Sequence, residues 1–476
     1  MTENTKDEPI ELPCYVAGES CGGELLEVFY PYTGELVGCV KSADSSILER
    51  ALAETVGTPM TRWQRHEILM KAKELLSASS DEFSNLIRRE SGLCMRETRY
   101  EVGRTQDVLQ FAAIESLRDD GQIFSCDISP QGQSRKIFTL REPLALAAAI
   151  TPFNHPLNQV AHKLAPAIAA GTPMILKPSD KTPLTAIRFS ELLYEAGLPP
   201  NMLSVIVGPI DEVVTPLIAD RRTELVSFTG SVAIGKTISK TAGYKKLCLE
   251  LGGNSPLIIM DDADLDLAVN LAAEGCFRNS GQRCTAVKRL LVHHAIVNKF
   301  TDLFLSKVKE YPCGDPFLDE TRVGTVISED SAKLLEKRIE DAVSLGATVL
   351  AGGKRTGACL EPTILGNVPR NAEMVIEESF GPLAPIMPIK DLDDAIELAN
   401  GTAFGLSSGI VTKDMDSAIA AIKRIRTGTV NVNTVPGYRI ESSPFGGVKD
   451  SGLGIKEGVI EAMKYMTNVK TFSMPW

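Results

Sequence analysis

The chain has 476 residues, more than one hydrophobic core usually spans, so two or three domains are expected. Hydrophobic residues make up 43% and charged residues 23%, which is typical of a globular protein. The net charge is −11 and no run of Lys and Arg exceeds two residues, which disfavours nucleic-acid binding. A locally cationic pocket for a small anion remains compatible with this acidity.

Membrane insertion, secretion and metal binding find little support in the sequence. No apolar run reaches membrane-spanning length, and the acidic segment Met1–Glu11 lacks the hydrophobic core of a signal peptide. The ten cysteines include no C-x-x-C pair, which argues against a disulfide framework or zinc ribbon. The five histidines show no metal-ligand spacing. We therefore expect a cytoplasmic protein without a metal site.

Helical periodicity and short β-branched runs alternate through the first half of the chain. The patterns predict helices over 44–56, 62–77, about 97–118, 182–195 and 231–241. They predict a strand pair over 123–140 that leaves the main body, and buried strands over 144–150, 173–176, 204–207, 225–228 and 246–250. Such alternation is typical of an α/β fold with a parallel sheet.

A second series begins after Gly252-Gly253. It comprises predicted strands over 257–260, 289–292 and 429–432, and predicted helices over 265–277, 295–309, 331–344, 393–400 and 415–426. A last short strand over 469–472 could add to the sheet of a neighbouring subunit. No low-complexity linker separates the two series, so the domain change is expected at a glycine hinge.

Three segments carry groups that suit covalent catalysis. Cys284 follows the turn Gly281-Gln282-Arg283, and Glu250 immediately precedes the glycine hinge. A thiol and a carboxylate on separate loops are a candidate nucleophile and general base. The segment Thr151-Pro152-Phe153-Asn154 offers a side-chain amide that can stabilise an oxyanion.

Two further segments suggest a nucleotide site. Phe228-Thr229-Gly230-Ser231 follows a strand and opens a helix, which suits a pyrophosphate, although a capped strand–helix turn is an equally good explanation. Lys177-Pro178-Ser179-Asp180 directly follows another strand, where α/β sheets bind their ligands.

Together these segments resemble the aldehyde dehydrogenase superfamily over nearly the whole chain, with Phe380-Gly381-Pro382 and Pro444-Phe445-Gly446-Gly447 as additional matches. The resemblance implies an α/β fold with a Rossmann-type cofactor domain, an α/β catalytic domain and a small β oligomerisation arm. The expected boundaries are 1–121 and 142–251 for the NAD-binding domain, 252–440 for the catalytic domain, and 122–141 and 455–476 for the arm. A homodimer or homotetramer is expected, because such strands pair across subunits in relatives.

The resemblance also implies the roles of individual residues. Cys284 attacks the aldehyde, Asn154 and the Cys284 N–H hold the oxyanion, and Glu250 activates water to hydrolyse the thioester. Arg283 and the cofactor cation are expected to lower the pKa of Cys284. The presence of Glu250 indicates release of a free acid, since relatives that acylate coenzyme A lack this base. The residues expected to bind the cofactor are Thr151, Pro152, Phe153, Lys177, Ser179, Asp180, Gly230, Ser231, Leu251, Glu378 and Phe380. NAD is favoured over NADP, because Asp180 would repel a 2′-phosphate.

The substrate positions depart from the general pattern of the superfamily. Two positions that are often aromatic in relatives hold His155 and Arg439, Arg283 precedes the nucleophile, and Arg104 lies on a long predicted helix. With Thr285, these residues are expected to line a pocket for a small anionic aldehyde. Each cation alone could instead be solvated or ion-paired.

In detail the pattern is most similar to phosphonoacetaldehyde dehydrogenases, which form phosphonoacetate in the breakdown of 2-aminoethylphosphonate. Lactaldehyde, sulfolactaldehyde and semialdehyde dehydrogenases share much of the motif set and are the alternatives. A non-catalytic structural or binding member of the superfamily ranks lowest, because Cys284 and Glu250 are both present.

Overall fold

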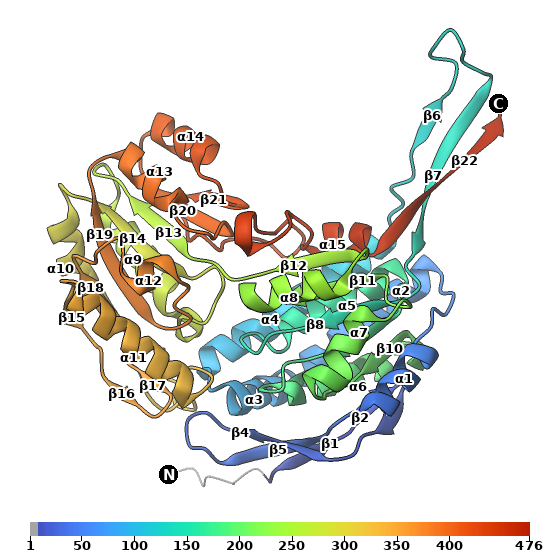
Figure 1. The fold of residues 1–476 in the computed structure, drawn as a ribbon, viewed down its shortest axis with the longest axis horizontal. Coiled ribbons are helices and arrows are strands. Elements are labelled where there is room, and N and C mark those ends of the chain that lie inside the picture. Colours follow the sequence, from blue (N-terminus) through green and yellow to red (C-terminus); the bar gives the residue numbers. More distant parts are fainter. Residues whose placement is uncertain (1–7) are drawn as a thin grey trace.

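The computed structural model describes residues 8–476, so most of the acidic segment predicted not to be a signal peptide lies outside the described residues. Two seven-stranded sheets, each flanked by helices, form the main body, and a narrow β arm projects from it (Figure 1). The α/β prediction is confirmed. No helix within the described part is long and apolar enough to cross a membrane.

The first sheet has the order β12-β11-β8-β9-β10-β2-β3. Its strands are β12 (Lys246–Glu250), β11 (Leu225–Thr229), β8 (Ala147–Ile150), β9 (Met174–Lys177), β10 (Leu203–Val205), β2 (Cys14–Val16) and β3 (Glu19–Cys21). The first five are parallel, and β2 and β3 extend the sheet with antiparallel pairing. The five parallel strands had been predicted, whereas β2 and β3 had not.

Helices pack on this sheet in layers. They are α1 (Ser45–Glu54), α2 (Arg62–Ala78), α3 (Ser80–Ser91), α4 (Met95–Ser116), α5 (Asn158–Ala170), α6 (Pro183–Glu195), α7 (Thr215–Ala219) and α8 (Val232–Ala242). Helix α4 packs against α2, α3 and α5. A small sheet of β1 (Ile10–Leu12), β5 (Leu36–Lys41) and β4 (Leu25–Phe29), absent from the sequence-based prediction, lies beside this half (Figure 1).

The second sheet follows the crossing at 251–254 and has the order β15-β18-β19-β14-β13-β20-β21. Its strands are β15 (Thr348–Ala351), β18 (Thr363–Gly366), β19 (Leu383–Ile389), β14 (Val287–His293), β13 (Ser255–Ile259), β20 (Ser407–Val411) and β21 (Thr429–Val432), all parallel except β15. Its helices are α9 (Leu265–Phe277), α10 (Val297–Val308), α11 (Glu329–Ser344), α12 (Glu373–Ile376), α13 (Leu392–Asn400) and α14 (Met415–Arg424). A hairpin of β16 (Arg355–Thr356) and β17 (Cys359–Leu360) packs against α11.

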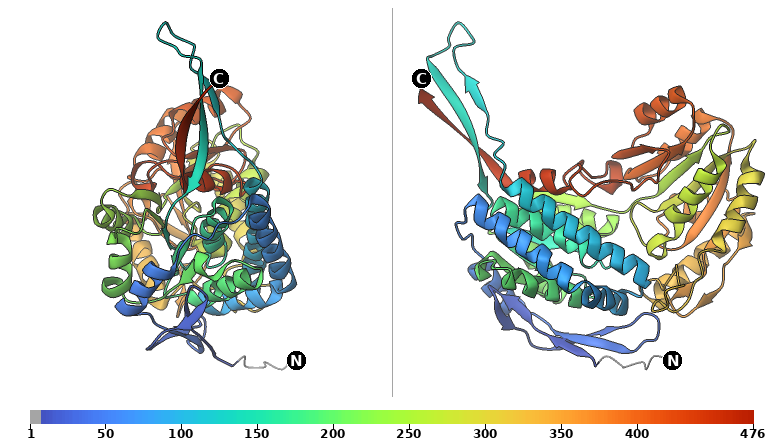
Figure 2. Two further views of the ribbon diagram at one scale, coloured as in Figure 1. Left: turned by 90° about the vertical axis from the view of Figure 1, so that its right-hand side faces the viewer. Right: turned by 180° about the vertical axis from the view of Figure 1, so that it is seen from behind.

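The projecting arm is a three-stranded sheet in the order β22-β7-β6 (Figure 2). It contains β6 (Ile123–Ser125), β7 (Arg135–Pro143) and β22 (Thr467–Pro475), which follows α15 (Val459–Tyr465). The C-terminal strand is longer than predicted and pairs over its whole length with β7 of its own chain, so it completes the arm and adds to neither sheet of the main body. The outer edge of β22 still carries backbone groups that another subunit can pair with.

Candidate active site

One cavity of about 270 Å³ brings the three predicted catalytic residues together at the crossing between the two halves. Cys284, Glu250 and Asn154 all contribute to its wall. Around them lie predicted cofactor residues from both halves of the chain, namely Pro152, Phe153, Gly230, Ser231, Leu251, Glu378 and Phe380. The remaining lining residues are Gln159, Thr229, Gly252, Gln282, Ser331, Leu334, Leu335 and Arg338, most of which sequence reasoning did not single out.

A tight left-handed turn positions Cys284, the predicted nucleophile. Asn279, Ser280 and Gly281 have consecutive positive φ values of 56°, 52° and 68°. A Cβ on Gly281 would lie 2.1 Å from the carbonyl oxygen of Gly381, so this position needs glycine for space as well as for φ. Lys288 Nζ holds the turn by donating to Gly281 O at 2.5 Å. Backbone strain of this kind is common next to reactive side chains that need a fixed orientation. Here the strained segment leads directly to Cys284.

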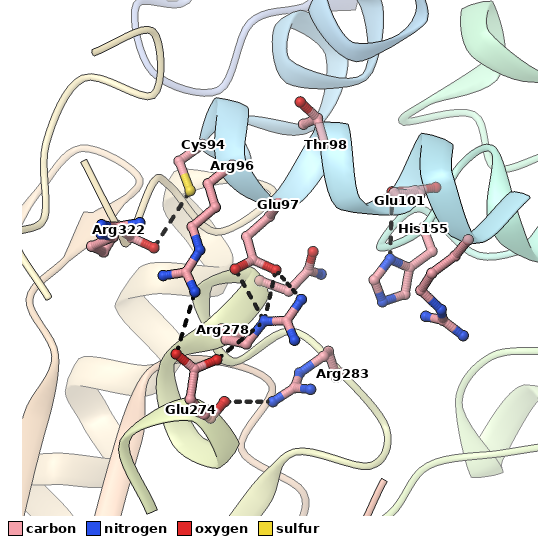
Figure 3. Close-up of polar contacts among 12 residues, drawn as sticks. Cys94, Arg96, Glu97, Thr98, Glu101, His155, Glu274, Arg278, Arg283 and Arg322 are labelled. Atoms are coloured by element: carbon pink, nitrogen blue, oxygen red, sulfur yellow. Dashed lines mark hydrogen bonds and ion pairs between the residues drawn. The ribbon is translucent and has the colours of Figure 1, made fainter. Parts of the chain in front are cut away.

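The surroundings of Cys284 favour the protonated form of its thiol. Burial is the main cause that raises its pKa to about 12, and Glu378 adds to the shift. Arg439 is the first group that lowers this pKa. The guanidinium of Arg283 instead donates to the backbone carbonyls of Glu274 and Gly275, both at 2.9 Å (Figure 3). The expectation that Arg283 activates the thiol is therefore not met in this structure.

The proposed oxyanion amide is tied to the nucleophile loop. Asn154 Nδ2 donates to Gln282 O at 2.8 Å, and Asn279 Nδ2 donates to Asn154 O at 3.0 Å. These reciprocal bonds fix the distance between the amide and the segment that carries Cys284. Asn279 was missed in the sequence, although its place five residues before the nucleophile was visible.

Glu250 is a buried carboxyl group whose charge is only partly compensated by its surroundings. Neither of its oxygens has a hydrogen-bond partner among residues 8–476. Its pKa is raised well above the ordinary value, first by burial and then by the charge of Glu457, while Lys163 and Arg439 oppose the shift. Lys163 forms a buried ion pair with Glu457 at 3.0 Å. An unpaired buried carboxyl in a cavity is a characteristic of acid–base sites.

The predicted cofactor residues of the first half gather at the carboxyl ends of β8, β9 and β11. Thr151, Pro152 and Phe153 follow β8, Ser179 and Asp180 follow β9, whose last residue is Lys177, and Gly230 and Ser231 follow β11. This is the edge at which α/β sheets bind nucleotides. Lys177 Nζ pairs with Asp180 Oδ1 at 2.5 Å.

Local geometry at this edge fits a dinucleotide. A Cβ on Gly230 would lie 2.4 Å from the ring of Phe228, so the backbone stays open towards the cavity. Ser231 caps α8 by accepting the Ile234 N–H, which leaves the helix N-terminus facing the cavity wall. From the other half, Glu378 accepts the Gly253 N–H at 3.0 Å. The segment from Phe228 to Ser231 is thus a capped strand–helix turn, and the same turn is also compatible with a bound pyrophosphate.

Three charged residues on one face of α4 organise the predicted substrate side. Glu97, Glu101 and Arg104 are spaced by four and three residues, so they share a helix face (Figure 3 shows the two carboxylates). Glu97 Oε2 accepts a hydrogen bond from Arg278 Nη2 at 3.0 Å, and Glu101 Oε2 lies 3.4 Å from His155 Nδ1. Glu101 also accepts two backbone N–H groups at the start of α5, which has no side-chain cap of its own.

The predicted cations are therefore held in different ways. Arg104 Nε pairs with Glu441 at 2.5 Å, and the second oxygen of Glu441 contacts His162 Nε2 at 2.6 Å. Arg439 lies over the Phe445 ring at 3.9 Å. Within the described chain, Arg439 Nη1 and Arg283 Nε are buried nitrogens with no hydrogen-bond partner.

Thr285 packs directly against the loop that carries Arg439. A Cβ on Gly437 would lie 2.3 Å from Thr285 Oγ1. The carboxylates Glu97, Glu101 and Glu441 were not identified from the sequence, because no motif marks them. The structure thus joins the predicted cations to partners from distant parts of the chain.

Comparison with known proteins agrees with this geometry. The aldehyde dehydrogenase family model matches residues 15–472. The chain is 37% identical over 457 residues to the 3-sulfolactaldehyde dehydrogenase of Priestia aryabhattai, covering 95% of this chain and 96% of that protein. The structure of aldehyde dehydrogenase 21 from Physcomitrella patens with its reaction product succinate superposes with a TM-score of 0.95 at 35% identity, covering 98% and 99% of the two chains.

An NAD-dependent aldehyde dehydrogenase from Sinorhizobium meliloti also superposes with a TM-score of 0.95, at 30% identity and with 100% and 96% of the two chains covered. Fold, cavity and comparisons together define an oxidoreductase that takes a nicotinamide dinucleotide. The chain belongs to the aldehyde dehydrogenase family. It is an NAD(P)-dependent aldehyde dehydrogenase.

Proposed function

We propose that this enzyme oxidises a small anionic aldehyde with NAD, and that phosphonoacetaldehyde, converted to phosphonoacetate, is its substrate. The observation that carries the proposal is the Arg439 side chain. Its charge is close enough to lower the pKa of both Cys284 and Glu250, yet its buried Nη1 has no partner among the described residues. A buried guanidinium N–H without an acceptor is costly, and an anionic substrate group would supply that acceptor.

The charges around Arg439 favour an anion. Arg104 and Arg439 share the single carboxylate of Glu441, whose pKa is lowered by His162 and by both arginines. Burial lowers the pKa of the His162 imidazole, and the neighbouring Glu441 opposes this shift. Glu441 balances Arg104 directly, whereas the charge of Arg439 acts on the carboxyls of Glu441, Glu250 and Glu457. A phosphonate next to the aldehyde would supply an acceptor for the unpartnered Nη1 of Arg439.

The catalytic cycle follows from the residues that line the cavity. Cys284 attacks the aldehyde carbon as a thiolate, and the Asn154 amide with the Cys284 N–H stabilises the oxyanion. Bound NAD would accept the hydride, which leaves a thioester on Cys284. Glu250, as carboxylate, takes a proton from water that hydrolyses the thioester. The product is a free acid, and coenzyme A is not needed.

The proposal also assigns a role to each part of the chain. We assign residues 1–121 and 142–251 to NAD binding, with Lys177 and Asp180 at the adenosine ribose and Glu378 and Phe380 at the nicotinamide half. Residues 252–440 supply the nucleophile loop. Residues 122–141 and 455–476 form the arm, which we assign to a homodimer or homotetramer.

A second substrate class is favoured by relatives. The 3-sulfolactaldehyde dehydrogenase and the succinate-bound aldehyde dehydrogenase 21 both handle molecules with an anionic group, as their names state. Sulfonate- or carboxylate-bearing aldehydes are therefore the alternative substrates of the same pocket.

An aldehyde panel tests the proposal. Phosphonoacetaldehyde, sulfoacetaldehyde, succinate semialdehyde and propanal are compared by kcat/KM, with NADH absorbance as the measurement. We expect phosphonoacetaldehyde to lead, and a lead by sulfoacetaldehyde would select the alternative. Preference for propanal would refute the anion pocket, and no NADH from any aldehyde would point to a non-catalytic protein.

A further inference from the structure

Two thiols that do not line the cavity lie close together. Cys313 follows α10, and Cys359 begins β17, so 46 residues (359 − 313) separate them in the chain. Cys313 Sγ lies 3.5 Å from the carbonyl oxygen of Leu360, and Cys359 Sγ lies 3.9 Å from that of Gly314. Each thiol thus contacts the residue that follows the other. This reciprocal arrangement brings the two side chains together between antiparallel-like segments, and both cysteines are partly exposed.

The two thiols are chemically unequal. The hydrogen bond between them is the main cause that raises the pKa of Cys313, and it is also the main cause that lowers the pKa of Cys359. One thiol of the pair can therefore hold the proton while the other reacts as thiolate. An attacking thiolate beside a second thiol is the arrangement found in dithiols that form disulfides readily.

The pair lies at a junction between the two halves of the protein. The segment after Cys313 reaches the start of α4, where Met95 N–H donates to Pro316 O and the Cys94 thiol donates to Arg322 O at 3.4 Å (Figure 3). The exposed Tyr32, in the turn between β4 and β5, is also near enough to feel both thiols. A covalent bond here would restrain the part of the second half that contacts the first half.

The same segment continues to the nucleophile loop. Val326 N–H donates to Ala358 O at 3.0 Å, immediately before Cys359. Gln282 Nε2 donates to Thr325 O at 3.3 Å, and the Ile327 N–H donates to Gln282 Oε1 at 2.9 Å. Gln282 is two residues before Cys284. The dithiol is thus connected to the active-site loop through one short run of backbone.

We propose that Cys313 and Cys359 are a modification site. They form a reversible intramolecular disulfide by exchange with a low-molecular-weight disulfide such as glutathione disulfide. The Cys359 thiolate attacks one sulfur of glutathione disulfide, which forms a mixed disulfide and releases one glutathione thiolate. The Cys313 thiolate then attacks Cys359 Sγ, forms the intramolecular disulfide and releases the second glutathione. The two protons lost by the protein thiols end on the two glutathiones, and the two electrons reduce the glutathione disulfide.

The first test uses the purified wild-type enzyme in glutathione redox buffers. After alkylation and digestion, mass spectrometry should find a peptide that joins Cys313 to Cys359, and dithiothreitol should remove it. The fraction joined should follow the ratio of oxidised to reduced glutathione. Cys39, a partly exposed cysteine without this arrangement, is the reference for oxidation. If Cys39 carries a glutathione adduct while Cys313 and Cys359 are still alkylated as two separate thiols, the proposal is overturned.

Variants test the exchange. Cys313→Ser and Cys359→Ser should each retain a glutathione adduct on the remaining thiol, because no second thiol displaces it, and the absence of an adduct from both variants would contradict the proposed exchange. Cys39→Ser is the matched control and should still form the joined peptide. Oxidation should raise the unfolding midpoint of wild type and of Cys39→Ser by a few degrees, because the bond restrains the unfolded chain, and should leave Cys359→Ser unchanged. Equal shifts in all three proteins would also refute the site.

Discussion

Glu441 Oε1 accepts the Nε–H of Arg104 at 2.5 Å, which joins the loop that carries Arg439 to the middle of α4. Both side chains are largely buried, so the charge of Arg104 is mostly balanced before any substrate arrives. Arg439, two residues before Glu441, keeps an unpartnered Nη1 in the described structure. The two arginines are therefore expected to differ in what they contribute to binding.

Arg439→Met should weaken use of phosphonoacetaldehyde more than Arg104→Met. Loss of one charge-assisted contact costs about 2 kcal/mol, or roughly thirtyfold in kcat/KM. Steady-state kinetics with propanal provides the comparison, because a neutral aldehyde has no anion to lose and should change by less than about threefold. Equal losses for the two aldehydes would mean that Arg439 supports the loop rather than the substrate.

Alkylation of Cys284 should report its raised pKa. Because the thiolate reacts, the rate with iodoacetamide in the free enzyme should keep rising with pH towards a pKa of about 12. NAD should shift this profile to lower pH, since its pyridinium carries a positive charge. The control is Cys284→Ala, because any alkylation of this variant comes from the other cysteines. This variant should form no NADH but should still bind NAD. A plateau near neutral pH in the free enzyme would contradict the buried, protonated thiol.

Glu250→Gln should stop the reaction after hydride transfer. We expect one rapid burst of NADH per active site and then slow turnover, because the thioester forms but no base activates water. In wild type, kcat should rise with pH, since Glu250 must lose a proton and burial raises its pKa. Stopped-flow absorbance distinguishes the cases. Normal steady-state turnover, or no burst at all, would remove Glu250 from this role.

Asp180→Ala should improve the use of NADP relative to NAD. The carboxylate at the expected ribose position repels a 2′-phosphate, and the variant would also free Lys177 from its ion pair. The ratio of kcat/KM for the two cofactors is the measurement. Wild type that already prefers NADP would show that Asp180 does not face the ribose.

The arm should hold two or more subunits together. Val469 and Phe472 on β22 are exposed, and the arm has no hydrophobic core within the described chain that would stabilise it alone. Light scattering should give a mass at least twice 51.4 kDa. Val469→Lys should shift the mass towards the monomer, whereas the same change at exposed Val343 on α11 should not. A monomeric wild type at micromolar concentration would refute the assignment.

Much of the fold was predictable because the parallel strands read as short apolar runs between helical periods. All five parallel strands of the first sheet were anticipated from such runs. In the second sheet β15, β18, β19 and β20 were missed, and β20, for example, begins Ser-Ser-Gly and has only two residues of clear strand preference. Helix α3 was missed because its many charged residues conceal a narrow apolar face. The short N-terminal strands are too brief to show a period.

The sequence by itself determined the family and the two-part α/β architecture, and it singled out Cys284, Glu250 and Asn154 as the predicted catalytic residues, because these residues lie in local motifs in a characteristic order. Only the tertiary structure decided which charged side chains form pairs. Arg104 meets Glu441 across 337 residues, and Glu101 meets His155 across 54. Such pairs depend on how α4 packs against α5 and the C-terminal loops. Packing of this kind sums many weak contacts that leave no periodic signal in the chain, so the number of cations could be read from the sequence, but not which of them remain available to a substrate.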